Sequence, residues 1–382
     1  NRQQRSTLQP RALSVITGMA GGGRSARQAE VKSVVWYDKA FAHREGAVDI
    51  SVEKWLVDTF AFKICTPPEI SHAEFLVDAY GSTGIANYGG SGRAGVINGY
   101  QVKGIGVTPF VDPDADWTHS HGSLLLQEGV RELVFSRVAA ELFPFGAIES
   151  VALIELQQNI TDDTGRSQRT ALLVRPFELR PCHFQRALGF RPNQINLRHL
   201  DDVLRVKSCV SMAARNCPAV ISDFARRLGA QIATMYRLGW FHGGVYSSNF
   251  SVSAKLIDFG SSRFIIDREP RSYSQHGPKF GEEMQFASML LRSWCYYWNR
   301  YAMGHNIDFN VLIRELYCGY EEQLLTYPSP TLGEVVGMYT WEYLNWRIDD
   351  LLAGPSIKFG EAVDMMIAEM VGNARKRIAE NG

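Results

Sequence analysis

The chain has 382 residues, of which 45% are hydrophobic, enough for a sizeable core in one large domain or two ordinary ones. Forty Lys and Arg residues balance forty Asp and Glu residues, so bulk charge gives no support for a nucleic-acid or anionic-membrane partner, and we expect neither. The longest apolar runs are far shorter than the roughly 20 residues of a membrane-spanning helix, so we expect no membrane span.

The cysteines are scattered through the chain, with no C-x-x-C pair and no metal-ligand spacing. They predict buried thiols in a reducing compartment, which favours a cytoplasmic location over a disulfide-rich secreted class. The cysteines are Cys65, Cys182, Cys209, Cys217, Cys295 and Cys318.

The N-terminal segment 1–30 is polar and rich in Arg, Gln and Gly, which predicts a flexible arm. The β-branched and aromatic residues of 31–37 and 55–65 predict strands or short buried segments. We expect these segments to begin a β-rich N-terminal lobe that covers residues 31–178.

A glycine-rich segment follows, with nine glycines between Gly81 and Gly106. A glycine-rich turn between two strands lets backbone N–H groups approach phosphates, and a Lys on the second strand can reach their oxygens. We therefore predict that a nucleotide is bound here. The residues concerned are Gly90, Gly92 and Arg93 in the turn and Lys103 on the strand after it. The alternative is an ordinary loop that has collected glycine.

The segment 110–122 contains three Asp residues together with His119 and His121. Two histidines at alternate positions near carboxylates are compatible with a metal site. No further ligand pair is in step with them, so we expect a solvated loop and keep the metal site as the alternative.

The segment 124–143 has apolar residues spaced for one buried face of a helix. It also contains Glu128, Arg131 and Glu132. In protein kinases a Glu on the helix after the lysine strand orients that lysine, and we predict this role for Glu132. The alternative is a surface charge pair.

Farther along, 148–156 and 169–177 predict the two strands of a hairpin.

The pattern becomes helical over residues 179–382, which we expect to form a C-terminal lobe. A long helix is predicted before the segment 239–264, and four more follow it. Strands with one helix, followed mainly by helices, predict an α+β protein of two lobes with its site between them. The predicted helices are 219–238, 281–301, 309–325, 332–352 and 357–378.

The segment 239–264 contains His242, then Asn249, then Asp258 in an Asp-Phe-Gly sequence after a short apolar strand. This layout is typical of phosphoryl-transfer enzymes of the protein-kinase type. An amide oxygen and a carboxylate on neighbouring loops can together hold Mg²⁺ against a triphosphate. We therefore predict Asn249 and Asp258 as metal ligands. The alternative is a buried Asp that follows a short strand.

One position departs from the kinase pattern. The catalytic Asp of a kinase stands two residues after the His, and that position here is Gly244. The usual acceptor of the substrate-hydroxyl proton is therefore missing. The chain is either a pseudokinase or it does different chemistry with the same metal-nucleotide site.

Several ordered blocks of the chain resemble the selenoprotein O family. The resemblance implies a protein-kinase-like fold and a protein adenylyltransferase, which binds ATP in a flipped orientation and moves AMP to a hydroxyl group. The chain would be a divergent and shorter member. The blocks are Gly92-Arg93-Ala94, the run from Gln101 to Pro109, Val130-Arg131-Glu132, the pair Arg175 and Arg180, and the loop from His242 to Gly260.

The resemblance also implies a role for each matching residue. Lys103 would contact phosphate and pair with Glu132, and together with Asp258 these are the expected catalytic residues. Asn249 and Asp258 would hold Mg²⁺ or Mn²⁺. The remaining implied contacts are Arg175 and Arg180, which would bind the outer phosphates of the flipped ATP.

The chain departs from the family at several points. Ser248 stands where the family has an Asp that is proposed to act as the base, so no general base is obvious. Arg175 and Arg180 are closer together than is usual. We see no counterpart of the family's redox-linked C-terminal cysteine.

Three functions remain open at this point. We expect ATP- and metal-dependent transfer of AMP to a Ser, Thr or Tyr hydroxyl of a protein or peptide. In the second, the same site adenylates a carboxylate, which is already anionic and needs no base, or transfers phosphate. In the third, the chain is a pseudoenzyme that binds a nucleotide or a partner without turnover.

Overall fold

A computed structural model describes residues 23–45, 51–64, 73–81, 88–187, 195–265, 270, 278–326, 341–354 and 359–380. Strands dominate the described chain up to residue 176, and helices dominate it from residue 181. This is the α+β arrangement of a β-rich N-terminal lobe and a mainly helical C-terminal lobe that the sequence predicts.

The N-terminal lobe is built on an antiparallel sheet with the strand order β2-β8-β11-β6-β5-β4-β1-β3, to which β7 adds by pairing with β11. Two short pairs, β9 with β10 and β12 with β13, lie outside this sheet. The strands are β1 Gly23–Gln28, β2 Val31–Tyr37, β3 Phe62–Ile64, β4 Ala73–Ala79, β5 Gly90–Ile97, β6 Tyr100–Lys103, β7 Leu124–Leu125, β8 Ala152–Leu156, β9 Ile160–Thr161, β10 Ser167–Gln168, β11 Thr170–Pro176, β12 Trp240–Phe241 and β13 Arg263–Phe264.

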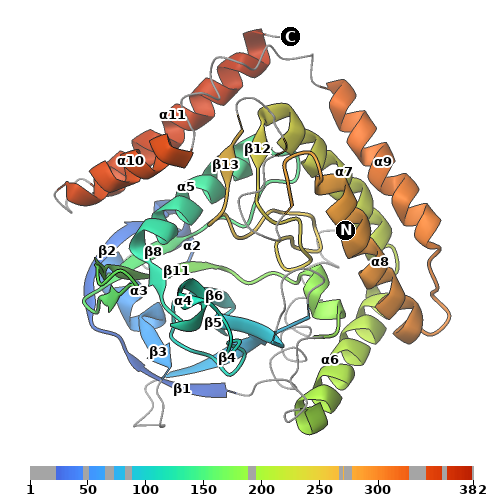
Figure 1. The fold of residues 1–382 in the computed structure, drawn as a ribbon, viewed down its shortest axis with the longest axis horizontal. Helices are drawn as coiled ribbons and strands as arrows, with labels where there is room; N and C mark the ends of the chain where they lie inside the picture. The colour runs from blue at the N-terminus through green and yellow to red at the C-terminus, as the bar shows by residue number, and fades with distance from the viewer. Residues whose placement is uncertain are drawn as a thin grey trace.

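Helices surround the sheet and form most of the C-terminal lobe. Figure 1 shows the sheet beside the group α6 to α9, with α5 running between the sheet and β12–β13. The helices are α2 Lys39–Arg44, α3 Val52–Phe60, α4 Trp117–Ser120, α5 Leu126–Leu142, the 3₁₀ helix η1 Pro181–Phe184, α6 Ile195–Asn216, α7 Val220–Leu238, α8 Glu283–Tyr301, α9 Phe309–Thr326, α10 Trp341–Ala353 and α11 Phe359–Glu380.

Most predicted elements are present, and the exceptions have physical reasons. The segment 55–65 is divided between two elements. Residues 55–60 end α3, because Leu56 and Phe60, four positions apart, bury one helical face, whereas 62–64 form strand β3 as expected. Residues 23–28, which we expected in the flexible arm, form β1, whose pairing with β3 and β4 satisfies its backbone groups despite a polar composition. The residues before β1 lie outside the described chain, as does 332–340 of the predicted helix 332–352.

The glycine-rich turn is also placed differently from the prediction. Gly90, Gly92 and Arg93 belong to strand β5, and the chain turns into β6 at Asn98 and Gly99. Both turn residues have positive φ, 51° and 80°, as a two-residue hairpin turn of type I′ requires. The turn between β4 and β5 includes residues 82–87, which lie outside the described chain.

The last two helices pack against the N-terminal lobe. Trp36 Nε1 of β2 donates to Asp364 Oδ1 of α11 at 2.8 Å, and Gln127 Nε2 of α5 donates to Asp349 Oδ1 of α10 at 2.9 Å. In Figure 1, α10 and α11 run alongside α5. Helix α5 is therefore held between the sheet and the C-terminal helices.

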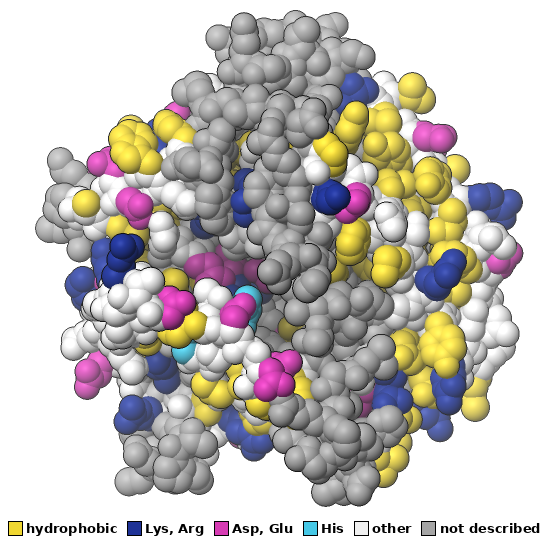
Figure 2. All heavy atoms as spheres, in the orientation of Figure 1, with side chains coloured by type: hydrophobic (Ala, Val, Ile, Leu, Met, Phe, Trp, Pro, Cys, Tyr) yellow, Lys and Arg dark blue, Asp and Glu magenta, His cyan; other side chains and the backbone are white. Residues whose placement is uncertain are grey.

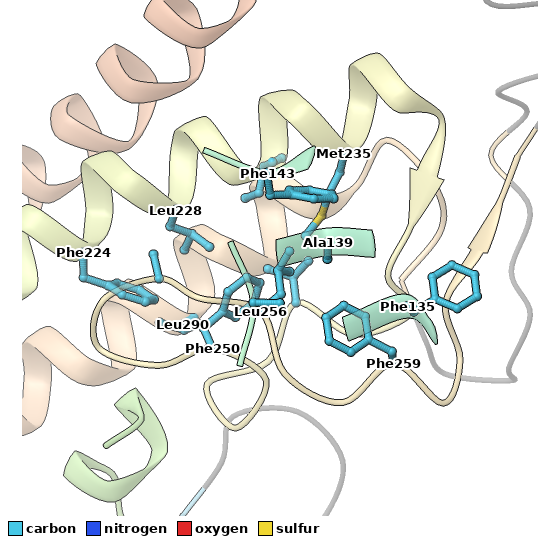
Figure 3. Close-up of a cluster of buried hydrophobic side chains, with 14 of the residues drawn as sticks. Phe135, Ala139, Phe143, Phe224, Leu228, Met235, Phe250, Leu256, Phe259 and Leu290 are labelled. Atoms are coloured by element: carbon cyan, nitrogen blue, oxygen red, sulfur yellow. The ribbon is translucent and has the colours of Figure 1, made fainter. Parts of the chain in front are cut away.

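A hydrophobic cluster joins α5, α7 and the loop between β12 and β13 (Figure 3). In Figure 3, Phe250, Leu256 and Phe259 of that loop lie against side chains from α5 and α7. All three loop side chains are buried. Because close-packed side chains resist displacement, this cluster fixes the loop that carries the predicted metal ligands.

The surface of the helical lobe exposes several large hydrophobic side chains. Figure 2 shows hydrophobic side chains gathered over α8 and α9. The exposed hydrophobic residues of these two helices include Met289, Tyr296 and Tyr317. No helix in the described ranges has both the length and the apolar character that crossing a membrane requires.

Candidate active site

The loop between β12 and β13 carries both predicted metal ligands on adjacent segments. The backbone N–H of Ile257 donates to the carbonyl oxygen of Asn249 at 2.9 Å. A second connection is the antiparallel bridge between Phe250 and Leu256. Asn249 and Asp258 are thus placed next to each other by backbone hydrogen bonds, as the sequence predicts.

His242 opens this loop and has a packing role. Its ring is buried and lies 6.1 Å from the ring of Phe250 and 5.4 Å from that of Phe259, between centroids. Burial lowers the pKa of His242 to about 4, so the imidazole is neutral at neutral pH. His242 therefore supports the loop by packing against Phe250 and Phe259.

Lys103, at the end of β6, contacts three carboxylates. Its Nζ contacts Glu132 Oε1 directly and lies 3.1 Å from Glu128 Oε1 and 3.2 Å from Asp258 Oδ1. Glu132 is only 1% exposed, which rules out the alternative of a surface charge pair. The predicted Lys–Glu pair is present, and Glu128, one helical turn earlier, shares the same ammonium group.

The charges of this cluster support one another. Burial and Arg93 lower the pKa of Lys103, but the nearby carboxylates outweigh them, so its net pKa is raised and the ammonium form is kept. Burial raises the pKa of Asp258, but Lys103, Arg175 and Arg93 hold it well below its usual range. For Glu132 the effect of burial prevails and its pKa is raised.

Asp258 also has an unusual backbone conformation. Its φ is +66°, in the left-handed region that few residues other than glycine adopt, although Asp and Asn tolerate it best. Such strain persists where the surroundings enforce it, and it is concentrated at functional sites. The conformation brings the carboxylate to Lys103 while leaving the side chain 44% exposed.

The structure brings both predicted phosphate-binding arginines to this region. Arg175 on β11 donates from Nη1 to Glu132 Oε2 at 3.4 Å. Arg180 donates from Nη1 to the carbonyl oxygen of Ser248 at 3.0 Å, which attaches it to the loop of Asn249. Both guanidinium groups are buried.

Arg93 and the two predicted glycines lie along β5. Arg93 forms a bidentate ion pair with Glu128, with distances of 3.0 and 2.6 Å, and so reaches the Lys103 cluster. A Cβ atom at Gly90 would lie 2.3 Å from the carbonyl oxygen of Asp78, and one at Gly92 would lie 2.9 Å from Val111 Cγ2. These glycines are needed for close packing, and their contact with a nucleotide stays a prediction.

The alternative metal site at 110–122 is not supported. Asp116 caps helix α4, and its Oδ1 lies 2.7 Å from Nδ1 of His119. Within the described ranges no group of three or more His, Cys, Asp or Glu residues is arranged to hold a metal ion.

Comparison with known proteins identifies the family. The family model described as "Protein adenylyltransferase SelO" matches residues 81–299, more than half of the chain. The chain belongs to the SelO family. A curated relative, the "Protein nucleotidyltransferase YdiU" of Marinomonas sp. (strain MWYL1), is 22% identical over 256 residues, which are 65% of this chain and 51% of that protein. The chain thus spans about half the length of this relative.

The structure accounts for two departures of this SelO-family chain from the expected patterns. Asn249 Nδ2 donates to the carbonyl oxygen of Gly244 at 3.1 Å, and a Cβ atom at Gly244 would lie 2.9 Å from that nitrogen. Ser248 Oγ donates to Asn249 Oδ1 at 3.0 Å. Gly244 and Ser248 both orient the Asn249 amide, and neither supplies a carboxylate.

The donor atoms of the SelO-family loop fit a divalent metal. Asn249 contributes an amide oxygen and Asp258 a carboxylate that stays ionised, and both are the hard oxygen ligands that Mg²⁺ and Mn²⁺ prefer.

Three residues that contact the predicted site residues were not themselves predicted: Asp78, Gln101 and Glu128. Glu128 could have been found, because it lies four positions before Glu132 and so on the same helical face. Asp78 is a single acid within the apolar run Leu76-Val77-Asp78-Ala79, and a buried acid of this kind needs a partner. Gln101 lies in a block that resembles the family, but nothing in the sequence indicates a role for its side chain.

Proposed function

We propose that this chain transfers AMP from ATP to a hydroxyl group of a protein or peptide, with a divalent metal held by Asn249 and Asp258. The observation that carries this proposal is the convergence of cationic side chains on one region next to Asp258. Arg93 and Arg175 lie at the ends of one chain of ion pairs, with Lys103 at its centre, linked to them through Glu128 and Glu132. Membership in the SelO family supports the same function.

The protein groups would act mainly by charge and position. Lys103, held by Glu132 and Glu128, and the arginines would offset the phosphate charge of the bound nucleotide. A divalent metal bound here would neutralise further phosphate charge and polarise a phosphoryl oxygen. Because the cationic groups are already placed by buried partners, little reorganisation is needed during the reaction.

The acceptor hydroxyl would attack the α-phosphorus of ATP. The bond from this phosphorus to the bridging oxygen breaks, pyrophosphate leaves, and the hydroxyl proton is released. Because neither Gly244 nor Ser248 supplies a carboxylate, the proposal has this proton pass to water or to the substrate itself.

A carboxylate acceptor is the second candidate, and Ser248 is the observation that favours it. The Ser248 hydroxyl is engaged with Asn249 and is no base at neutral pH. A carboxylate oxygen is already anionic, so its attack on the α-phosphorus forms an acyl adenylate and pyrophosphate with no proton to remove.

The test is incubation of the chain with a panel of acceptor proteins and peptides and with ATP labelled on the α- or the γ-phosphate. The proposal expects acceptor label from α-labelled ATP only, and release of pyrophosphate. Label that neutral hydroxylamine removes indicates an acyl adenylate, whereas label that survives it indicates the phosphodiester of a hydroxyl. Label from the γ-phosphate alone contradicts AMP transfer, and no label with Mg·ATP binding intact indicates a pseudoenzyme.

A further inference from the structure

Asp78 is a buried acid at the centre of a network of hydrogen bonds and ion pairs. It lies on β4 with no exposed surface. Its Oδ2 accepts from Gln101 Nε2 at 2.6 Å and directly from Arg180 Nη2, and its Oδ1 lies 3.0 Å from His183 Nε2. A buried ion carries a large desolvation cost, so a carboxylate held in this way needs a specific reason.

The Asp78 Oδ2 atom connects to two arginines, one directly and one through Gln101. Asp78 contacts Arg180 directly, and it reaches Arg175 through Gln101, whose Oε1 accepts from Arg175 Nε at 2.8 Å. One carboxylate therefore orients two guanidinium groups that come from different elements.

Each arginine is also held from a second side. The Arg180 guanidinium lies 4.6 Å from the centre of the Tyr80 ring and donates to the Ser248 carbonyl oxygen. Arg175 contacts Glu132. A guanidinium has five N–H groups, and these contacts with protein oxygens use two on each arginine, so the others are available to a phosphate.

His183 completes the network without adding charge. Its Nδ1 accepts from the backbone N–H of Arg180 at 2.9 Å, so the proton lies on Nε2, which donates to Asp78. Burial lowers the pKa of His183 to about 4. The neutral imidazole leaves the Asp78 carboxylate to balance Arg180.

We infer that Asp78 is a positioning residue that sets Arg175 and Arg180 for the outer phosphates, so that the site selects a nucleoside triphosphate over nucleotides with fewer phosphates. The inference rests on the proposed function, in which these two arginines bind the outer phosphates. A purely structural role for Asp78 has a different consequence, because general loosening of the lobe weakens ATP and AMP binding alike.

The test is calorimetric measurement of ATP, ADP and AMP affinity in the presence of Mg²⁺ for the full chain and for Asp78→Asn. Loss of a negative charge beside a phosphate site would by itself strengthen phosphate binding. A weaker affinity of Asp78→Asn for ATP therefore indicates that Arg175 and Arg180 have moved from their positions. We expect the ATP affinity to fall at least ~10-fold, the ADP affinity less, and the AMP affinity less than ~2-fold, as for lost hydrogen bonds between charged groups.

The matched control is Glu155→Gln. Glu155 is also a buried carboxylate of the same sheet, 1% exposed on β8, but its partners are Arg169 at 2.7 Å and Lys32 at 3.1 Å. This variant should leave the ratio of ATP to AMP affinity unchanged. Equal weakening of ATP and AMP by Asp78→Asn, an unchanged ATP affinity, or a stronger one would each overturn the inference.

A second variant tests the inference if Asp78→Asn does not fold. Gln101→Met keeps the side-chain length but removes the connection to Arg175, so the ATP affinity should fall ~3-fold or more with AMP binding unchanged. An unchanged ATP affinity in this variant contradicts the inference. Binding of ATP without AMP transfer would contradict only the proposed function, whereas a parent chain that does not bind ATP would overturn both.

Discussion

Lys103 Nζ lies 3.2 Å from Asp258 Oδ1, although the two residues are 155 positions apart in the chain. This contact joins the end of β6 in the N-terminal lobe to the Asp-Phe-Gly segment that follows Asn249. It also keeps the Asp258 carboxylate ionised, because the ammonium group is the main influence that lowers the pKa of this acid. The expected metal ligand is therefore anionic at any physiological pH.

Asp258→Asn should remove most metal-dependent ATP binding. Asn tolerates the left-handed backbone conformation at this position, so the change removes the charge without adding strain. Loss of an anionic ligand should weaken ATP binding in Mg²⁺ at least ~10-fold, or about 1.4 kcal/mol. Titration of ATP with Mg²⁺ and with EDTA measures this effect, and a variant that binds Mg·ATP like the parent would remove Asp258 from the metal site.

Lys103→Met should abolish most transfer activity while the chain stays folded. It removes a buried cation that would face the phosphates, a loss that typically costs ~10²-fold or more in rate. The fold should persist because Glu132, whose pKa burial already raises, can take up a proton. The rate of label transfer and a thermal melt test this prediction, with Lys32→Met as a control on an exposed lysine. A parental rate would exclude Lys103 from the mechanism.

Gly90→Ala should destabilise the N-terminal lobe. The added Cβ would lie 2.3 Å from the carbonyl oxygen of Asp78, and a backbone atom on a paired strand cannot move away cheaply. Overpacking of this kind costs about 1–3 kcal/mol. Gly372→Ala on α11 is the matched control, because its Cβ would meet no atom within 4 Å. Denaturant unfolding measures the free energy of unfolding of both variants. If Gly90→Ala is as stable as Gly372→Ala, β4 and β5 are not packed so closely.

Glu283 should make the stability of the chain depend on pH. Burial raises its pKa to about 7, from 4.5 for an ordinary Glu, and its Oε2 accepts from the backbone N–H of Gly281 at 2.7 Å. The folded state thus holds its proton longer than the unfolded state does. The stabilisation is complete below pH 4.5 and is lost as the pH rises through about 7.

Glu283→Gln, which stays neutral, should therefore melt at a higher temperature than the parent at pH 8 and at nearly the same temperature at pH 4.5. Glu282→Gln, at the partly buried neighbouring position, serves as the control. A melting difference that does not change with pH would show that Glu283 does not titrate in this range.

Local patterns predicted the parts of this protein that depend on neighbouring residues. The apolar spacing of 124–143 and 219–238 was sufficient for α5 and α7, because a helix buries one face whatever it packs against. Asn249 and Asp258 were placed together for a similar reason, since a short loop joins them. The Lys–Glu pair followed from the order of a lysine strand and an acidic helix.

The tertiary structure decided what joins distant segments. Strand pairing made β1 from a polar sequence, and the hydrogen bond from Trp36 on β2 to Asp364 on α11 joins segments near opposite ends of the chain. The union of Arg175 and Arg180 through Asp78 depends on the register of β4, β6 and β11. The sequence by itself therefore determined which chemical groups are available and in which kind of element they lie. Which of these groups meet was decided by the tertiary structure, because side-chain contacts between distant strands and helices depend on strand register and helix packing, which no local pattern contains.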